Sequence, residues 1–178
     1  MTENPDAALL MEKLLSKEIR YAITYVPRTD YSWAQSTAAV LVRTKPSPVI
    51  LVLNADSVDP ETIRDRRVMN EELIGFPKTK RIKVALAIPE VEILLFQDRA
   101  ILEELFDCEI SDVDWARAEF IPRTILQKLL TQGPQSMTLE ELLDQLTPPM
   151  IEKLRHHPLL QDLTEFLVET AELQPVLA

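Results

Sequence analysis

Glycine, cysteine and histidine are scarce in this chain of 178 residues, and each shortage excludes a class of site. With only two glycines, Gly75 and Gly133, a P-loop or Rossmann phosphate loop is excluded, because both need several glycines within a few residues. The single cysteine, Cys108, allows neither an internal disulfide nor a cysteine cluster for a metal. The only histidines, His156 and His157, are adjacent and point about 100° apart on a helix. A histidine-rich zinc site and a Ser-His-Asp triad are therefore excluded as well.

Long apolar runs and positive net charge are also missing. No segment approaches the roughly 20 apolar residues that span a bilayer, and residues 1–6 lack the basic and apolar regions of a secretory signal. Together with the single cysteine, this predicts a cytoplasmic protein with no membrane partner. The net charge of −10 disfavours nucleic acid as a partner, because phosphate backbones bind basic surfaces. Hydrophobic residues make up 46% of the chain, enough for a folded core.

Strand and helix patterns alternate over the first 106 residues. β-Branched and aromatic residues at 19–26, a continuous apolar run at 49–53, and a run at 82–88 that is apolar except for Lys83 predict three strands. Helical spacing predicts four helices before, between and after these strands. The last of them is expected to break near Gln97. Their ranges are 5–17, 32–43 with Ser32 as N-cap, 59–74, and 92–106. Such alternation implies right-handed crossovers and a small parallel sheet of about three strands with flanking helices.

After Phe106 only helices are predicted. Prolines separate them, and Thr138 with Glu141 fits the capping box. The expected helices cover residues 122–131, 138–146, 148–156 and 158–172. We therefore expect an α/β domain over residues 1–106 and an all-helical extension over residues 107–178 that packs on it as one structural unit. The simplest role of these amphipathic helices is packing, and they also suit a protein partner or a homo-oligomer.

Carboxylates follow two of the predicted strands. Asp56 and Asp59 come after the second strand, and Glu90 and Glu92 come after the third. Because the carboxyl ends of neighbouring parallel strands meet at one edge of the sheet, these side chains are expected to converge. One or two carboxylates can suffice for Mg²⁺. A metal held there would assist phosphodiester chemistry by polarising a phosphoryl oxygen or activating water.

A structural interpretation of the same carboxylates stays open. Asp59 precedes Pro60 and is a typical helix N-cap. Asp56 is equally suited to a turn. Glu90 and Glu92 follow Pro89, where they would complement the dipole of a helix. On this interpretation no metal binds at the strand ends.

The basic side chains also have a structural and a functional interpretation. The only basic cluster lies just before the third strand and is either a solvated surface or a contact for nucleic-acid phosphates. Its members are Lys78, Lys80, Arg81 and Lys83, with Arg64, Arg66 and Arg67 on the preceding helix.

Trp33 and Trp115 are expected in the core or at its edge, because tryptophan usually buries most of its area.

Three short stretches match, in order, the motifs of a known family. Residues 3–10 (ENPDAALL) are similar to a Glu-Gly-x-x-Asp turn and helix. Residues 51–57 (LVLNADS) look like a strand with an Asp-x-Asp motif, and residues 88–96 (IPEVEILLF) look like a later acidic-apolar segment. The order resembles a TOPRIM domain of the OLD-nuclease-like branch, over roughly residues 1–106.

The resemblance implies Mg²⁺-dependent cutting or joining of nucleic-acid strands. It gives Glu3 the role of the general acid or base. Asp56 matches the second metal-binding aspartate, and Glu92 matches a supporting carboxylate.

The chain departs from the family pattern at its first two motifs. The first motif lacks its glycine and is one residue short, no strand precedes it, and Asn54 replaces the first aspartate of Asp-x-Asp. A catalytic carboxylate has to be held within about 0.5 Å, and an N-terminus without a strand is not expected to hold Glu3 so closely.

These departures lead to one expected function and two alternatives. We expect a TOPRIM-like protein that is non-catalytic or weakly active and acts through protein interaction. One alternative is a Mg²⁺-dependent nuclease or related phosphotransfer enzyme acting on nucleic acid. The other is a scaffold with no cleft at the strand ends. Whether the chain is an enzyme is left open by the sequence.

Overall fold

The computed structural model describes residues 1–15, 23–28, 30–74, 81–132 and 136–172. The fold is mixed α/β, mostly helical, around a small parallel sheet. Its two strands are β1 (Val49–Asn54) and β2 (Ile82–Ala87), which pair from Val49 opposite Ile82 to Asn54 opposite Ala87. Both lie at the mainly apolar runs that predicted them, because each strand is buried on both faces.

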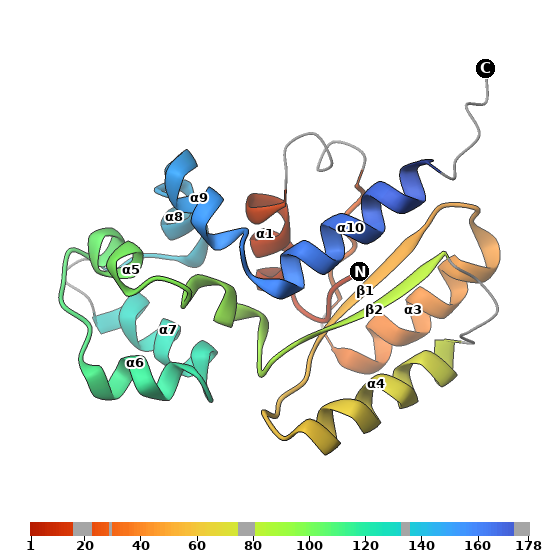
Figure 1. Cartoon of the computed structure of the whole chain (residues 1–178), viewed down its shortest axis with the longest axis horizontal. Helices are drawn as coiled ribbons and strands as arrows, with labels where there is room; N and C mark the ends of the chain where they lie inside the picture. The colour runs from red at the N-terminus through yellow and green to blue at the C-terminus, as the bar shows by residue number, and fades with distance from the viewer. Residues whose placement is uncertain (16–22, 29, 75–80, 133–135, 173–178) are drawn as a thin grey trace.

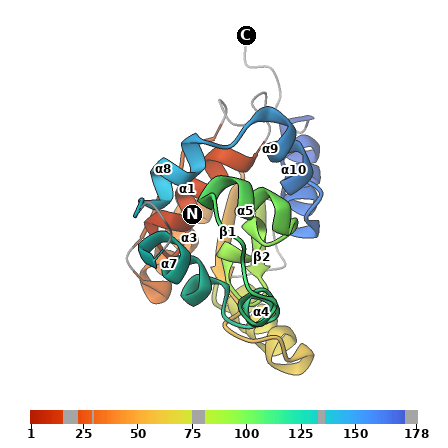
Figure 2. The ribbon, with the colours of Figure 1, turned by 90° about the vertical axis from the view of Figure 1, so that its left-hand side faces the viewer.

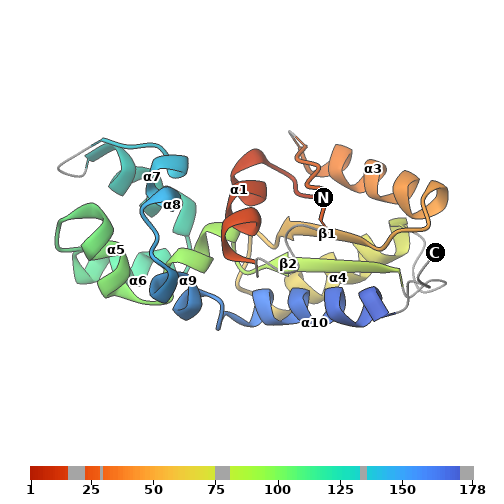
Figure 3. The same cartoon turned by 90° about the horizontal axis from the view of Figure 1, so that it is seen from above.

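Helices cover both faces of this sheet (Figures 1 and 3). They are α1 (Pro5–Leu14), α3 (Tyr31–Thr44), α4 (Pro60–Ile74) and α10 (Pro158–Glu172). Leu51 and Leu53 belong to a core cluster with residues of α3 and α4, whereas Val52 and Ala85 belong to a larger cluster with residues of α1 and α10. Alternate residues of each strand therefore serve opposite faces of the sheet.

The remaining helices gather at one end of the strands, as Figure 2 shows from that end. They are the 3₁₀ helix η1 (Val91–Leu95), α5 (Arg99–Phe106), α6 (Asp112–Ala118), α7 (Pro122–Gln132), α8 (Leu139–Asp144) and α9 (Pro148–Leu154). The predicted break near Gln97 is confirmed, because Asp98 caps α5. The larger core cluster contains Leu10, Leu102 and Leu163, so it crosses residue 106. None of the helices in the described part of the chain is long and apolar enough to cross a membrane.

The first predicted strand does not form as expected. Its residues 19–22 lie outside the described residues, and residues 23–26 form no strand. Instead Pro27 and Thr2 form a single parallel bridge, in which the Arg28 amide donates to the Thr2 carbonyl at 3.0 Å. The Thr2 amide in turn donates to the Val26 carbonyl at 3.4 Å, so the residues on either side of Pro27 make both hydrogen bonds of the bridge.

The expectation that Glu3 lacks support is wrong. Thr2 also bridges Val52, and the Val52 amide donates to the Met1 carbonyl at 2.9 Å, so residues 1–2 lie along the edge of β1 as a strand would. On the other side of Glu3, Asn4 caps α1 by accepting from the Ala7 amide at 2.7 Å. The backbone of Glu3 is therefore held between a sheet contact and a capped helix.

Two predictions about α3 are also wrong. The N-cap is Asp30 rather than Ser32, since the Trp33 amide donates to Asp30 Oδ1 at 2.8 Å. An aspartate at this position also complements the helix dipole, which serine cannot do. The Trp33 side chain is not in the core but is 57% exposed. Trp115, by contrast, is half-buried against Phe96.

Candidate functional site

An open cleft of about 430 Å³ lies beside the carboxyl end of β1. This volume is within the usual range of ligand pockets, about 300–1,000 Å³. The segment just before α1, the start of α3 with its N-cap, α4, α7 and the loop after β1 supply the lining residues, and most of these are charged. They are Glu3, Asn4, Asp30, Tyr31, Asp56, Arg66, Met69 and Arg123. The scaffold alternative expected no cleft at the strand ends, and a cleft lies there.

Asp56 is paired with an arginine from α4. Arg66 Nη1 lies 2.6 Å from Asp56 Oδ2 and also donates to the Asn54 carbonyl at 3.1 Å. The Arg66 guanidinium lies 5.8 Å from the centre of the Tyr31 ring. Asp56 itself has φ 47°, in the left-handed region that aspartate tolerates better than most residues. A guanidinium is thus paired with the carboxylate that the sequence predicted as a metal ligand.

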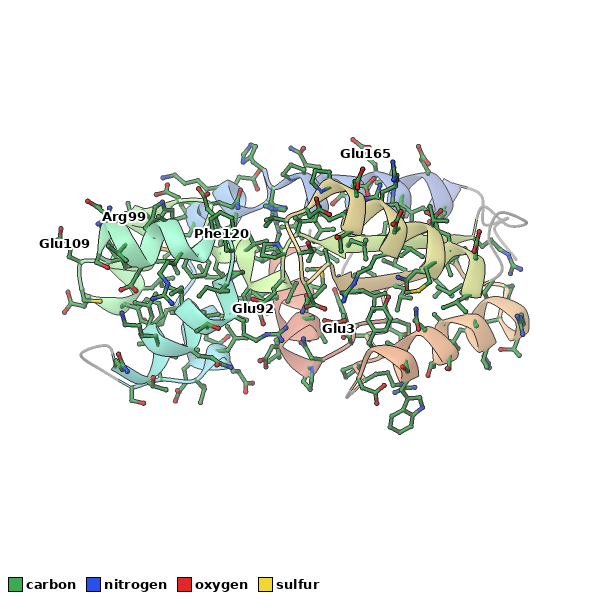
Figure 4. All side chains as sticks on the ribbon, turned by 90° about the horizontal axis from the view of Figure 1, so that it is seen from below. Glu3, Glu92, Arg99, Glu109, Phe120 and Glu165 are labelled. Carbon is green, nitrogen blue, oxygen red and sulfur yellow. The ribbon has the colours of Figure 1, made fainter. Side chains whose placement is uncertain are left out.

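Glu92 is paired with an arginine from α7. Its side chain is 2% exposed, and Oε1 accepts from Arg123 Nε at 2.9 Å. Burial raises the pKa of Glu92, and the hydrogen bond from Arg123 opposes this shift. Glu90 contacts the same arginine, because its Oε2 accepts from the Arg123 backbone amide at 3.1 Å, in the first turn of α7. Figure 4 shows Glu3 and Glu92 in the middle of the molecule, where the sheet meets the helical end.

Three buried polar atoms around this ion pair lack a hydrogen-bond partner. They are Glu92 Oε2, Arg123 Nη2 and Asn54 Nδ2. The oxygen of the Asn54 side chain is used, since it accepts from the Val91 amide at 2.9 Å. Asn54 therefore ties the end of β1 to η1, and that oxygen is not available to a ligand.

Glu3 has the most perturbed carboxyl group of the cleft. Burial raises the pKa of Glu3 to about 7, with a further rise caused by Asp56. A hydrogen bond from the Asn54 backbone and the charges of Arg123 and Arg66 lower the pKa of Glu3 but do not offset the burial. A carboxyl group with this pKa is suited to exchange a proton near neutral pH.

Asp59 is a helix cap. Its Oδ2 accepts from the Thr62 amide at 2.8 Å and from Thr62 Oγ1 at 2.6 Å, at the start of α4. These hydrogen bonds lower the pKa of Asp59. The carboxylate is thus engaged by α4 and is not among the residues that line the cleft.

Replacing Asp59 by alanine is expected to lower the free energy of unfolding, the usual effect of losing an N-cap. Asp59→Asn keeps an oxygen acceptor, so we expect a clearly smaller loss of stability than in Asp59→Ala. Urea unfolding monitored by circular dichroism measures both variants. Equal losses in the two variants would contradict the capping role.

Of the basic cluster, Arg66 lines the cleft, whereas Arg81 and Lys83 lie away from it. Lys78 and Lys80 are outside the described residues. Arg81 precedes β2 and donates to the Lys45 carbonyl at 2.9 Å, and Lys83 pairs with Asp162 of α10 at 2.5 Å. Both are therefore at the amino end of β2, whereas the cleft lies beside the carboxyl end of β1.

The structure does not bring the predicted metal ligands together as one group. Glu3 and Asp56 share the cleft, Glu90 and Glu92 surround Arg123, and Asp59 caps α4. Among the residues that the structure describes, no three Asp, Glu, His or Cys side chains form a group that could hold a metal ion.

Sequence reasoning missed both arginines as partners of the carboxylates. Neither pairing has a local signal, because Arg66 lies 10 residues from Asp56 and Arg123 lies 31 residues from Glu92 in the sequence.

Comparison with known proteins does not assign the chain to a family. No protein-family model matches it, and no curated protein or solved structure does either. The resemblance to TOPRIM domains therefore rests on the residues alone.

Proposed function

We propose that this chain is a TOPRIM-like domain that acts through protein interaction and does not carry out metal-dependent phosphodiester chemistry. The observation that carries this proposal is that an arginine pairs with each of the two carboxylates, Asp56 and Glu92, that match the TOPRIM motifs. Arg66 lies 2.6 Å from Asp56, and Arg123 lies 2.9 Å from Glu92.

Mg²⁺ would have to displace these guanidinium groups to reach the carboxylates. It needs oxygen ligands and prefers near-octahedral geometry, whereas Arg66 already holds both the Asp56 carboxylate and the Asn54 carbonyl. The residues present therefore do not fit a magnesium ion in their observed arrangement, and we derive no catalytic step through one.

A protein is the partner that the surface favours. The net charge of −10 opposes binding to phosphate backbones. Several large apolar side chains are more than half exposed, and a surface where such residues gather on one face is typical of protein contacts. They are Trp33, Val40, Leu73, Val113 and Phe120.

One observation favours the alternative, a Mg²⁺-dependent nuclease or related phosphotransfer enzyme. Glu3 is held by the backbone on both sides, lines the same cleft as Asp56, and has a pKa raised to about 7 by burial. These are properties that a general acid or base needs.

Calorimetric titration with MgCl₂ and MnCl₂ separates the two functions. We expect no saturable binding by the wild type up to low-millimolar metal, and no cleavage of DNA or RNA in the same buffers. Arg66→Gln frees Asp56 and is expected to gain weak binding, whereas Arg64→Gln, an exposed arginine on the same helix, is not. Micromolar to low-millimolar binding by the wild type that is lost in Asp56→Ala would favour the nuclease.

A further inference from the structure

Helix α3 carries a single charged residue in a protein that is otherwise rich in charge. Charged residues make up 27% of the chain, yet residues 31–42 contain no Asp, Glu, Lys or Arg, and Arg43 in the last turn is the only charged residue of α3. Ala34, Ala38 and Val42 face the sheet and are buried. The opposite side of the helix faces solvent and carries no carboxylate.

The outer face of α3 is also apolar. Trp33 and Val40, seven residues and about two turns apart, are 57% and 56% exposed. Between them lie Ser36 and Thr37, whose hydroxyl groups donate to the carbonyls of Ser32 at 2.9 Å and Trp33 at 2.8 Å. Because these hydroxyl groups already donate to carbonyls of their own helix, another molecule can cover them without breaking their hydrogen bonds.

An arginine holds Trp33 in place on this face. The Arg28 guanidinium lies 5.6 Å from the centre of a Trp33 ring, and Arg28 Nε donates to Thr37 Oγ1 at 3.1 Å. Tryptophan is enriched among the residues that dominate binding energy at interfaces, and a preset side chain loses less entropy on binding.

We propose that this face of α3 is a homodimer interface, in which α3 packs antiparallel on α3 of a second copy. A two-fold axis between Ser36 and Thr37 makes the face self-complementary, as a symmetric dimer requires. Trp33 then lies against the partner's Val40, and Ser36 lies beside the partner's Thr37. The small side chains at the axis allow the two helices to approach closely.

Charge complementarity selects a second copy as the occupant. The exposed Asp30 precedes α3, and the exposed Arg43 lies in its last turn. The same two-fold axis brings Asp30 beside the partner's Arg43 at both ends, and the two helix dipoles run in opposite directions. Two copies that each carry a net charge of −10 repel across acidic surfaces, whereas residues 31–42 contain no Asp or Glu, so this face lets the copies meet without bringing carboxylates together.

This interface deepens the proposed function by naming the protein partner, and the two can fail separately. Metal titration tests the cleft, whereas the state of association tests α3. One helix pair is a small interface, at the low end below about 1,200 Å² in total. We therefore expect a dissociation constant in the micromolar range.

Size-exclusion chromatography with light scattering, over a range of concentrations, tests the interface with a matched pair of valines. Val40 of α3 is 56% exposed and Val113 of α6 is 66% exposed, and the two helices lie at opposite ends of the molecule (Figure 1). We expect the wild type and Val113→Glu to reach twice the 20.4 kDa chain mass. Val40→Glu is expected to raise the dissociation constant at least tenfold, because it buries two like charges near the axis. A monomeric wild type, or a Val40→Glu variant that associates as well as Val113→Glu, would overturn the proposal.

A cysteine at the axis tests the geometry without introducing charge. In a Cys108→Ser background, Ser36→Cys is expected to form a disulfide-linked dimer on mild oxidation, because the two-fold axis brings the two cysteines together. Thr124→Cys, at an exposed position on α7, is the control and should stay monomeric on a non-reducing gel. Equal cross-linking of both variants, or none in Ser36→Cys, would overturn the antiparallel arrangement.

Discussion

Glu3→Gln should leave the free energy of unfolding unchanged near pH 4.5 and raise it by about 2 kcal/mol near pH 8. The folded pKa of Glu3 is raised to about 7 from an ordinary value of 4.5, so the folded state holds this proton more tightly than the unfolded state. The stabilisation is fully present below the unfolded pKa and is lost as the pH rises through about 7. Glutamine keeps the shape and the acceptor oxygen but never ionises, so only the wild type loses stability in this window.

The size of this effect follows from the shift in pKa and from the partial exposure of the side chain. One unit of pKa corresponds to about 1.4 kcal/mol, and we expect less than the full shift because solvent screens a group that is only partly buried. Burial lowers the pKa of the Met1 amine to about 6, so this group also makes stability depend on pH. Both proteins carry it, and its contribution cancels when the variant is compared with the wild type at the same pH.

Urea unfolding at a series of pH values measures the Glu3 effect. The control is Glu104→Gln, an exposed glutamate on α5, which should stay within about 0.5 kcal/mol of the wild type throughout. A difference between Glu3→Gln and the wild type that does not change with pH would show that Glu3 is not buried as described.

Arg123→Ala should lower the free energy of unfolding by about 3 kcal/mol at neutral pH, the lower end of the range for breaking a buried ion pair. The substitution leaves the carboxylate of Glu92, 2% exposed, without its cation, and it removes a side chain that is itself 35% exposed. The pKa of Glu92 is already raised by burial, and without Arg123 it rises further. The loss should therefore shrink at acid pH, where Glu92 takes up a proton.

A second substitution separates this charge effect from lost packing. Glu92→Gln in the Arg123→Ala background removes the unpaired charge and should restore more than half of the stability at neutral pH. Arg67→Ala, at an exposed position on α4, is the control and should change stability by less than about 0.5 kcal/mol. If the double variant were as unstable as Arg123→Ala, the ion pair would not be the cause.

The sheet and its helices could be predicted where a local pattern exists. Mainly apolar runs predicted β1 and β2, because strands covered on both faces need apolar side chains at most positions, and Lys83 is the one charged residue in either strand. The residues Asp59 and Pro60 predicted the start of α4, and Thr138 with Glu141 predicted the capping box of α8. Each of these signals lies within a few neighbouring residues.

What could not be predicted depends on contacts between distant segments. Thr2 pairs with Val52 of β1 and with Pro27 through one bridge each. A strand contact made by a single residue has no alternating pattern in the sequence, so it could not be predicted. Helix α6 is only seven residues long, and its Val113 is exposed, so it lacks an apolar stripe. The pairing of Asp56 with Arg66 and of Glu92 with Arg123 depends on how α4 and α7 are placed, which no motif in the chain encodes.

The division of the core between the two faces of the sheet sets an order for folding during synthesis. All the buried residues of the cluster between the sheet and helices α3 and α4 lie between Ala34 and Leu86, so the ribosome supplies them early. The larger cluster extends to Leu163. The part of the second face that α10 covers, against β2, therefore stays uncovered until residues 158–172 have left the exit tunnel. Until then the nascent chain exposes apolar surface that chaperones recognise and that favours aggregation.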